Sequence, residues 1–220
     1  MVMDNLAEHS GNGLEIFKKA VSRTEKRVEK TKTKLLKAAL EVFSEYGIDA
    51  ATIGDITQRA DLGKGTFYRH FADKSEIVAC LVEQAIDKLI GKLQIVGQAT
   101  NVETALEDII NVHCRFFMEH PEEFILLFQG RLFLKLDRQI TEQMEGPFSR
   151  YLEVIENLLS PFMKEKKDIV RIRRLACAVA GFVFGFFSFA MIGMEAEEIE
   201  TSIKPLRQSF VKSLSLFLAQ

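Results

Sequence analysis

The residues with the clearest binding chemistry lie between Lys64 and His70, in the sequence KGTFYRH. Lys64 and Arg69 carry cationic N–H donors suited to guanine edges or phosphates, and the hydroxyl of Thr66 can contact either a base or a phosphate. Tyr68 and His70 add further hydrogen-bonding groups within the same seven residues. This combination on one short segment fits the recognition of DNA.

Two short helices joined by a tight turn are needed to position these groups. Thr52, followed three residues later by Asp55, predicts a capping box at the start of the first helix. Residues 61–63, Asp-Leu-Gly, end that helix, since glycine tolerates backbone angles that other residues avoid. In the second helix, residues 64–71, Phe67 and Phe71 are four apart and share an inward face, which leaves the polar residues outward. The pattern predicts a helix-turn-helix over residues 52–71.

A longer pattern surrounds this motif. Its residues are Leu36-Lys37-Ala38-Ala39, Phe43 and Gly47, then Thr52, Ile56 and Ala60, then residues 64–71, and then Asp73-Lys74-Ser75-Glu76. With them, the stretch from Thr33 to Val78 resembles the DNA-binding domain of the TetR family of bacterial repressors. Two mild departures are Thr57, where the family usually has a smaller residue, and Asp61, where it usually has glycine. The rest of the chain resembles the family in length and helical pattern only.

The resemblance implies a ligand-responsive, sequence-specific transcriptional regulator. We expect a homodimeric repressor on a near-palindromic double-stranded DNA operator, which it leaves when a small lipophilic or aromatic molecule binds its C-terminal domain. Residues 1–28 would form a basic extension, 29–89 the DNA-binding domain and 90–220 the effector-binding and dimerisation domain. The implied DNA-binding residues are Thr52, Gly54, Lys64, Gly65, Thr66, Tyr68, Arg69, His70 and Lys74. Of these, Thr52, Tyr68 and Lys74 are expected to clamp phosphates, and the backbone is expected to approach DNA at Gly54 and Gly65.

Charge is distributed unevenly along the chain, although its net charge is only −2. From Phe17 to Lys37 there are nine Lys or Arg residues against Glu25 and Glu29, a net charge of +7. Two interpretations stay open for this lead-in. It is a solvated stretch that extends the first helix, or it is a basic arm that runs along the phosphate backbone or into the minor groove.

No catalytic motif is present. Residues 63–66, Gly-Lys-Gly-Thr, resemble part of a phosphate loop, but the first glycine is missing and a glycine separates the lysine from the threonine. The four histidines lack metal-ligand spacing, and the three cysteines, Cys80, Cys114 and Cys177, are widely separated. We therefore expect no enzyme activity, no cofactor and no metal. The thiols and the lack of an apolar leader predict a cytoplasmic protein.

Apolar spacing and caps predict an all-α chain of about nine helices. The first firm helix covers residues 31–46 and ends at Gly47, and a long one runs from Asp73 to about Val96. Further helices are expected to begin at Thr100 with a capping box, at Pro121, at about Arg171 and at Pro205, and Pro147 is expected to start or kink the seventh helix. Alternatively, Gly146-Pro147 forms a loop between two shorter helices.

Leu175 to Gly193 is the most apolar segment, with no charge and Ser188 as its one hydroxyl. Such a run is a membrane-span candidate, and Gly181 and Gly185 match a motif of closely packed membrane helices. The alternative function is thus a dimerising or membrane-associated protein that works through residues 175–193. We favour the middle of a helical dimer, because no second apolar segment accompanies it. The family places a dimer interface on the last two helices, here Gly181, Gly185, Leu206, Phe210, Leu214 and Phe217.

Phenylalanines are abundant enough to line a pocket for a lipophilic or aromatic ligand. The candidate lining is His113, Phe117, Phe124, Phe128, Phe182 and Phe186. His113 is adjacent to Cys114, and neighbours on a helix point about 100° apart, so the pair is a poor metal chelate. We expect His113 to be a hydrogen-bonded core residue or a polar group of the pocket.

Overall fold

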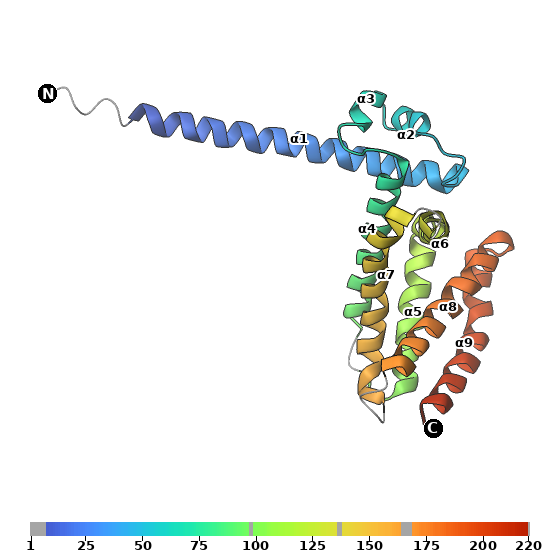
Figure 1. Cartoon of the computed structure of the whole chain (residues 1–220). Coiled ribbons are helices and arrows are strands. Elements are labelled where there is room, and N and C mark those ends of the chain that lie inside the picture. The colour runs from blue at the N-terminus through green and yellow to red at the C-terminus, as the bar shows by residue number, and fades with distance from the viewer. Residues whose placement is uncertain (1–7, 97–98, 136–137, 164–168, 220) are drawn as a thin grey trace.

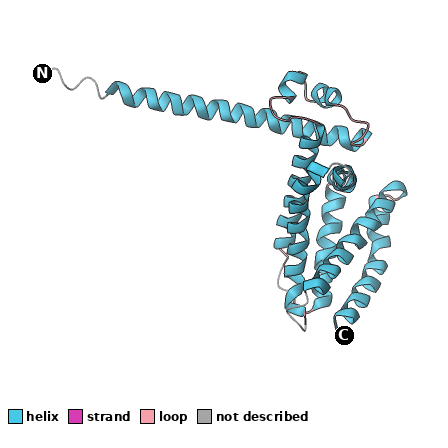
Figure 2. Cartoon of the chain, in the orientation of Figure 1, coloured by secondary structure: helices cyan, strands magenta, loops and turns pink. Residues whose placement is uncertain are grey.

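The computed structural model of the protein describes residues 8–96, 99–135, 138–163 and 169–219. Every regular element in these ranges is a helix, which confirms the prediction of an all-α chain (Figures 1 and 2). A 3₁₀ turn, Ser160–Phe162, follows α7. The α-helices are α1 (Glu8–Tyr46), α2 (Ile53–Arg59), α3 (Lys64–Phe67), α4 (Lys74–Gln94), α5 (Val102–Glu119), α6 (Pro121–Lys135), α7 (Arg138–Leu159), α8 (Ile169–Gly193) and α9 (Ala196–Ala219).

The C-terminal part of α1, with α2, α3 and the first turns of α4, forms a small head. Its core contains the predicted apolar stripe of α1, including Leu35 and Phe43, packed with Ile56 of α2 and Phe67 of α3. Gly47 ends α1 at a φ of +79°, the left-handed conformation expected of a glycine just past a helix. The helices of the head therefore follow from local sequence patterns.

Helix α1 is much longer than the helix predicted over residues 31–46. It starts at Glu8, so the basic lead-in is helical and continuous with the helix that packs in the head. Figure 1 shows this N-terminal part of α1 running clear of the rest of the molecule. We call residues 8–30 the arm.

Lys74 closes the head from the side of α4. Its ammonium group donates to three backbone carbonyls in the connection between α1 and α2, those of Ile48 (2.7 Å), Asp49 (3.0 Å) and Ala51 (2.9 Å). Asp73 accepts a hydrogen bond from the backbone N–H of Glu76, as predicted for the cap of α4. The first turn of α4 is thus tied to the connection that precedes the helix-turn-helix.

Three helix starts differ from those predicted. Helix α5 is capped by Asn101, whose side chain accepts from the N–H of Thr104, and not by Thr100. Helix α9 begins at Ala196 instead of Pro205. Glu197 and Glu198 lie in its first turn, where the helix dipole favours negative charge, and the Glu195 N–H donates to the Glu198 carboxylate (3.1 Å).

The third difference is α7, which begins at Arg138 and continues through Pro147. A helix start at Pro147 and the alternative Gly146-Pro147 loop are both wrong, whereas the other prediction, a seventh helix kinked at Pro147, agrees in placing this proline inside α7. Proline removes one backbone hydrogen bond from a helix. Here Pro147 is buried and α7 packs against α4 and α8, so tertiary packing outweighs that local cost.

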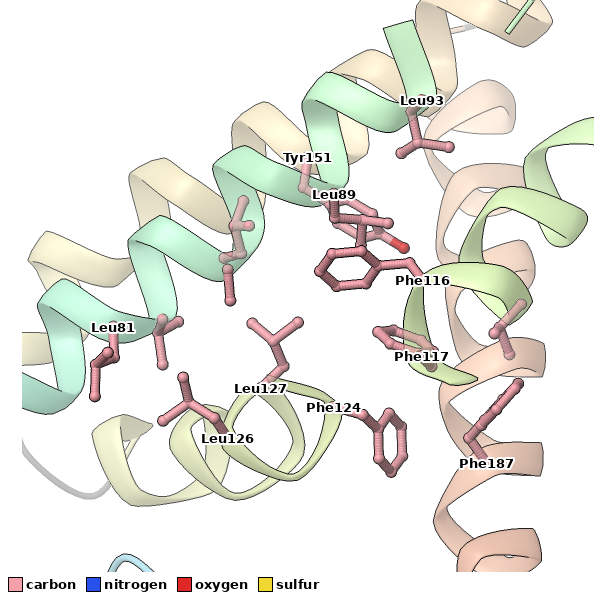
Figure 3. Packing of buried hydrophobic residues seen from close by; sticks show 14 of the residues in the cluster. Leu81, Leu89, Leu93, Phe116, Phe117, Phe124, Leu126, Leu127, Tyr151 and Phe187 are labelled. Atoms are coloured by element: carbon pink, nitrogen blue, oxygen red, sulfur yellow. The ribbon is translucent and has the colours of Figure 1, made fainter. Parts of the chain in front are cut away.

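The body core joins α4, α5, α6, α7 and α8 through large apolar side chains (Figure 3). The ring centroid of Phe117 lies 5.0 Å from that of Phe124 and 5.0 Å from that of Phe184. Phe187 packs on the rings of Phe117 and Phe124, at 5.5 and 5.8 Å. Helix α8 supplies its apolar residues to this core and also packs against α9.

His113 lies fully buried at the edge of these rings. Its Nδ1 is 2.7 Å from the carbonyl oxygen of Ile109, and its Nε2 is 2.7 Å from the hydroxyl of Tyr151. Because a carbonyl only accepts, Nδ1 carries the proton and Nε2 accepts from the tyrosine O–H. Burial lowers the pKa of His113 from 6.5 to about 4. The imidazole is therefore a neutral, hydrogen-bonded core group, one of the two roles expected for it.

This burial predicts an acid sensitivity of the fold. The unfolded chain binds a proton at His113 below about pH 6.5 and the folded chain only near pH 4, so stability falls as the pH is lowered through that window. At about 1.36 kcal/mol per pKa unit, the loss approaches roughly 3 kcal/mol near pH 4. Urea unfolding at several pH values would measure it, and His113→Gln should show a shallower pH dependence than the wild type.

The control is His120→Gln, which removes a histidine that is only partly buried. That variant should keep the pH dependence of the wild type. If His113→Gln and the wild type lose stability in parallel between pH 6.5 and about pH 4.5, the buried neutral imidazole is not the cause.

Candidate nucleic-acid interface

Helix α2 starts with the predicted capping box. Thr52 Oγ1 accepts from the N–H of Asp55 (3.2 Å), and the Asp55 carboxylate accepts from the N–H (2.9 Å) and hydroxyl (2.6 Å) of Thr52. These hydrogen bonds from Thr52 stabilise the charged carboxylate and lower the pKa of Asp55. The polar side chain of Thr52 is thus held at the exposed start of α2.

The turn between α2 and α3 depends on Asp61. Its φ is +51°, a left-handed conformation that aspartate tolerates better than most residues. The N-cap of α3, Gly63, has an ordinary extended φ of −79°. The prediction that glycine supplies the unusual backbone angle is therefore wrong, and Asp61 takes over that role.

Ion pairs of Arg59 fix α2 on α1, and the hydroxyl of Thr57 is satisfied within α2 itself. Arg59 forms a two-pronged ion pair with Glu45 (2.8 and 2.6 Å) and reaches Glu41 at 3.4 Å. Thr57 is buried, and its hydroxyl donates to the carbonyl of Ile53 (2.9 Å) or Gly54 (3.1 Å). The larger residue at this position is accommodated without an unsatisfied hydroxyl.

Helix α3 and the turn after it hold the predicted reading residues on the outer face of the head. Lys64, Gly65, Tyr68 and Arg69 are exposed, whereas Thr66 and His70 are partly buried. Regular helix ends at Phe67, and backbone hydrogen bonds carry the turn on to Phe71. A guanidinium nitrogen of Arg69 donates to Thr66 Oγ1 (3.0 Å), so two candidate base contacts are aligned with each other.

The two glycines occupy different surroundings. A Cβ on Gly65 would meet no atom within 4 Å, so the backbone of α3 is open toward solvent there. A Cβ on Gly54 would lie 3.3 Å from Thr52 Oγ1 and 3.5 Å from Lys64 Cε. The starts of α2 and α3 therefore meet at Gly54, where Thr52 and Lys64 converge.

Lys74 does not fit its predicted place in this set. All three donors of its ammonium group are directed at carbonyls of the α1–α2 connection. That geometry gives Lys74 a role in holding the head together and leaves no donor for a phosphate.

A cavity of about 390 Å³ lies just beyond the C-terminal end of α4, among α5, α7, the 3₁₀ turn and residues that follow α4. It is lined by Val96, Ala99, Ala105, Ile109, Asn157, Leu158, Pro161 and Phe162. Asn157 is the one polar side chain of this lining. None of these residues was a sequence candidate, because ordinary apolar residues at helix ends carry no signal for a cavity.

The six predicted pocket residues are not in this lining. His113, Phe117, Phe124 and Phe128 pack in or against the body core, and Phe186 lies beside Phe187. Phe182 stacks on Phe210 of α9, with ring centroids 4.3 Å apart. Their role as ligand contacts stays a prediction.

The predicted dimer residues lie along one outer side of α8 and α9. Gly181 and Gly185 are exposed, and a Cβ on either would meet no atom within 4 Å. Leu206 and Phe217 are exposed, while Leu214 is partly buried. Two residues missed from the sequence extend this apolar surface: Phe189 is 80% exposed and Ile192 is 81% exposed.

Metal and membrane sites have less support than a DNA interface. Among the described residues, no group of three or more His, Cys, Asp or Glu side chains could hold a metal ion. One described helix, Val170–Gly193, is long and apolar enough to cross a membrane, and 44% of its most apolar window is buried. A single span of this kind is weak evidence, since a core helix of a soluble protein has the same composition.

Known proteins share this architecture. Residues 35–81 match the family described as bacterial regulatory proteins, tetR family. Over 129 residues the chain is 31% identical to the uncharacterized HTH-type transcriptional regulator YvdT of Bacillus subtilis, a match that covers 56% of this chain and 64% of that protein. The sequence similarity thus spans less than two thirds of that relative.

Solved structures extend the likeness beyond the head. The fatty acid degradation regulator FadR from Bacillus halodurans has a TM-score of 0.62 at 18% identity, over 85% of this chain and 93% of that one. The transcriptional regulator FadR from Bacillus subtilis, solved in complex with stearoyl-CoA, has a TM-score of 0.61 at 17% identity, over 84% and 96%. The head geometry and the family match over residues 35–81 together identify the helix-turn-helix head as that of the TetR family of bacterial regulatory proteins, and the described chain shares the fold of such regulators.

Proposed function

We propose that the protein is a homodimeric, sequence-specific DNA-binding regulator of transcription that acts in the cytoplasm as a ligand-released repressor. The observation that carries this proposal is the outer face of α3, where cationic and hydrogen-bonding side chains are exposed on a rigid head. Helix α3 would enter the major groove of a near-palindromic operator.

Each predicted side chain has a distinct task in this proposal. Arg69 and Thr66 would meet base edges, since an arginine can donate two hydrogen bonds to a guanine. Lys64, Tyr68 and Thr52 would contact phosphates and fix the register of the head. Gly54 and Gly65 would let the backbone approach the DNA, and His70 would lie at the edge of the contact.

Dimerisation through α8 and α9 would supply the second head. Their outer faces combine small residues, Gly181 and Gly185, with exposed apolar side chains such as Phe189 and Leu206. Helices with this pattern pack closely against partner helices. Two heads held about one DNA turn apart, roughly 34–36 Å, would match the two half-sites.

The proposed effector is a lipophilic molecule with a long aliphatic part. A lining of apolar residues with a single amide, Asn157, favours an alkyl chain that ends in a hydrogen-bonding group. The FadR regulator of Bacillus subtilis, which shares this fold, was solved with stearoyl-CoA bound, and this supports a fatty acyl compound here. Because the cavity adjoins the C-terminal end of α4, its occupancy would act on the head through that helix.

The first prediction tests base reading by Arg69. Arg69→Ala should weaken binding to the preferred operator by about 1–3 kcal/mol and reduce discrimination at one base position of each half-site. The operator would first be selected from random duplexes with the full chain, and affinities would then be measured on it and on its single-base variants.

The control for this prediction is Arg115→Ala, which removes an exposed arginine from α5 in the body. Arg115→Ala should bind as the wild type does. If Arg69→Ala lowers the affinity equally for every DNA sequence, Arg69 contacts only phosphates.

The second prediction concerns the dimer. Gly185→Leu places a side chain where a partner helix should pass, and overpacking typically costs about 1–3 kcal/mol. The dimer dissociation constant should rise roughly 5- to 150-fold in sedimentation experiments, and operator binding should weaken with it.

Gly91→Leu is the matched variant, since a Cβ on Gly91 of α4 also meets no atom within 4 Å. It should leave the dimer intact. A Gly185→Leu protein that stays dimeric at nanomolar concentration would place the dimer interface elsewhere.

The third prediction concerns the effector. A long-chain acyl-CoA at about 100 times its dissociation constant should stabilise the protein by about 2.7 kcal/mol. Ala99→Phe should fill part of the cavity and abolish this stabilisation, while Ile95→Phe, at an exposed neighbouring position, should not. Thermal unfolding measures both effects, and full stabilisation of Ala99→Phe would exclude the cavity as the site.

A further inference from the structure

The arm and the start of the head present a row of exposed cations that the helix-turn-helix does not use. Lys26, Arg27, Lys30, Lys34 and Lys37 are all exposed along α1. Glu25 and Glu29 are the acidic residues between positions 24 and 37. A cationic surface of this density is an electrostatic partner for a polyanion.

These cations share one side of α1. At about 100° per residue, Lys26, Arg27, Lys30, Lys34 and Lys37 fall within an arc of about 100°, and Glu25 and Glu29 lie on the other side of the helix. The spacing concentrates the positive charge on a single straight face.

The orientation of this face is given by the ion pairs of the head. Glu41 and Glu45 continue the same arc of α1, and both pair with Arg59 of α2. One edge of the cationic face is therefore next to α2, on the side on which the helix-turn-helix lies, whereas Lys37 at the other edge lines a hollow with α4 and α6.

The direction of the arm completes the geometry. In Figure 1 the arm leaves the head on the side opposite α8 and α9. With a dimer formed through α8 and α9, the two arms would point away from the dimer axis, outward along the DNA on each side of the operator.

We propose that the arms bind the phosphate backbone of the duplex outside the two half-sites, in a sequence-independent manner; this inference rests on the proposed function. At about 1.5 Å per residue, the cations from Lys26 to Lys37 extend over about 17 Å of α1, close to half a turn of B-DNA. Each cationic face thus lengthens the contacted DNA by up to about half a turn on its side.

The test compares two duplexes that carry the same selected operator. The core duplex ends at the outer edges of the half-sites, and the long duplex adds about ten base pairs of unselected sequence on each side. The full chain is titrated with each duplex over a range of salt concentrations. The variant carries Lys26→Gln, Arg27→Gln and Lys30→Gln, substitutions that keep good helix formers at exposed positions.

The wild type should bind the long duplex at least about tenfold more tightly, with a steeper salt dependence. The triple variant should lose this gain, with a loss in slope of up to about 2.7 per arm at roughly 0.9 for each phosphate contact. A control variant with Arg115→Gln, Lys204→Gln and Lys212→Gln, the same change of net charge at exposed positions in the body, should bind as the wild type does.

Equal affinities and slopes of the wild type on the core and long duplexes would overturn the proposal while leaving operator recognition intact. A triple variant that changes oligomeric state but keeps the wild-type salt slope would also overturn it, because the arm would then contact protein. Failure of the wild type to prefer any sequence would instead refute the proposed function, and this inference with it.

Discussion

The burial of α4 along its whole length is the constraint on which the rest of the structure depends. Near its start, Ile77 and Val78 complete the core of the head, and near its end Leu89 and Leu93 lie in the body core. Fully burying such side chains stabilises a fold by about 1.5–3 kcal/mol each. One helix is thus shared by both parts of the molecule, and neither part can change its packing without affecting it.

Helix α6 reinforces this junction from the body. The side-chain oxygen of Gln129 accepts from the N–H of Ile48 (3.0 Å), in the connection that Lys74 also holds. Gly130 lies so close to α4 that a Cβ there would be 2.7 Å from a methyl group of Val82. Contacts this tight transmit displacement, since packed interfaces switch between discrete arrangements and do not deform smoothly. In the proposed function, a ligand at the far end of α4 would bias the head in this way, and if it weakens DNA binding, linkage requires that DNA weaken ligand binding by the same factor.

Features that depend on neighbouring residues could be predicted from the sequence, and features that depend on distant residues could not. The helix-turn-helix was predictable because the Thr52 cap, the Phe67–Phe71 spacing and Gly47 act through neighbouring residues. The starts of α7 and α9 were not, because a proline read locally as a helix start is here held inside a helix by packing and terminal charge. Lys74 was assigned to phosphate because its type fits DNA, whereas its partners lie 23 to 26 residues earlier in the chain.

The candidate pocket shows the same limit. The sequence contains many phenylalanines, but their number does not indicate which rings pack on one another. Phe117 and Phe124 fill the core with each other and with α8, and the cavity lies instead among residues such as Ala105 and Ile109. A cavity is a property of how helix ends meet, and single-residue types carry little information about it.

Sequence reading by the exposed face of α3 is tested most directly by the affinity of the full chain for its selected operator. The reference is a shuffled duplex of the same length, at a physiological salt concentration of about 0.15 M. We expect a ratio of the two affinities of at least about 10³, the lower end for specific DNA-binding proteins. A ratio near one, with the same salt dependence on both duplexes, would mean that the head contacts phosphates alone and that α3 reads no sequence.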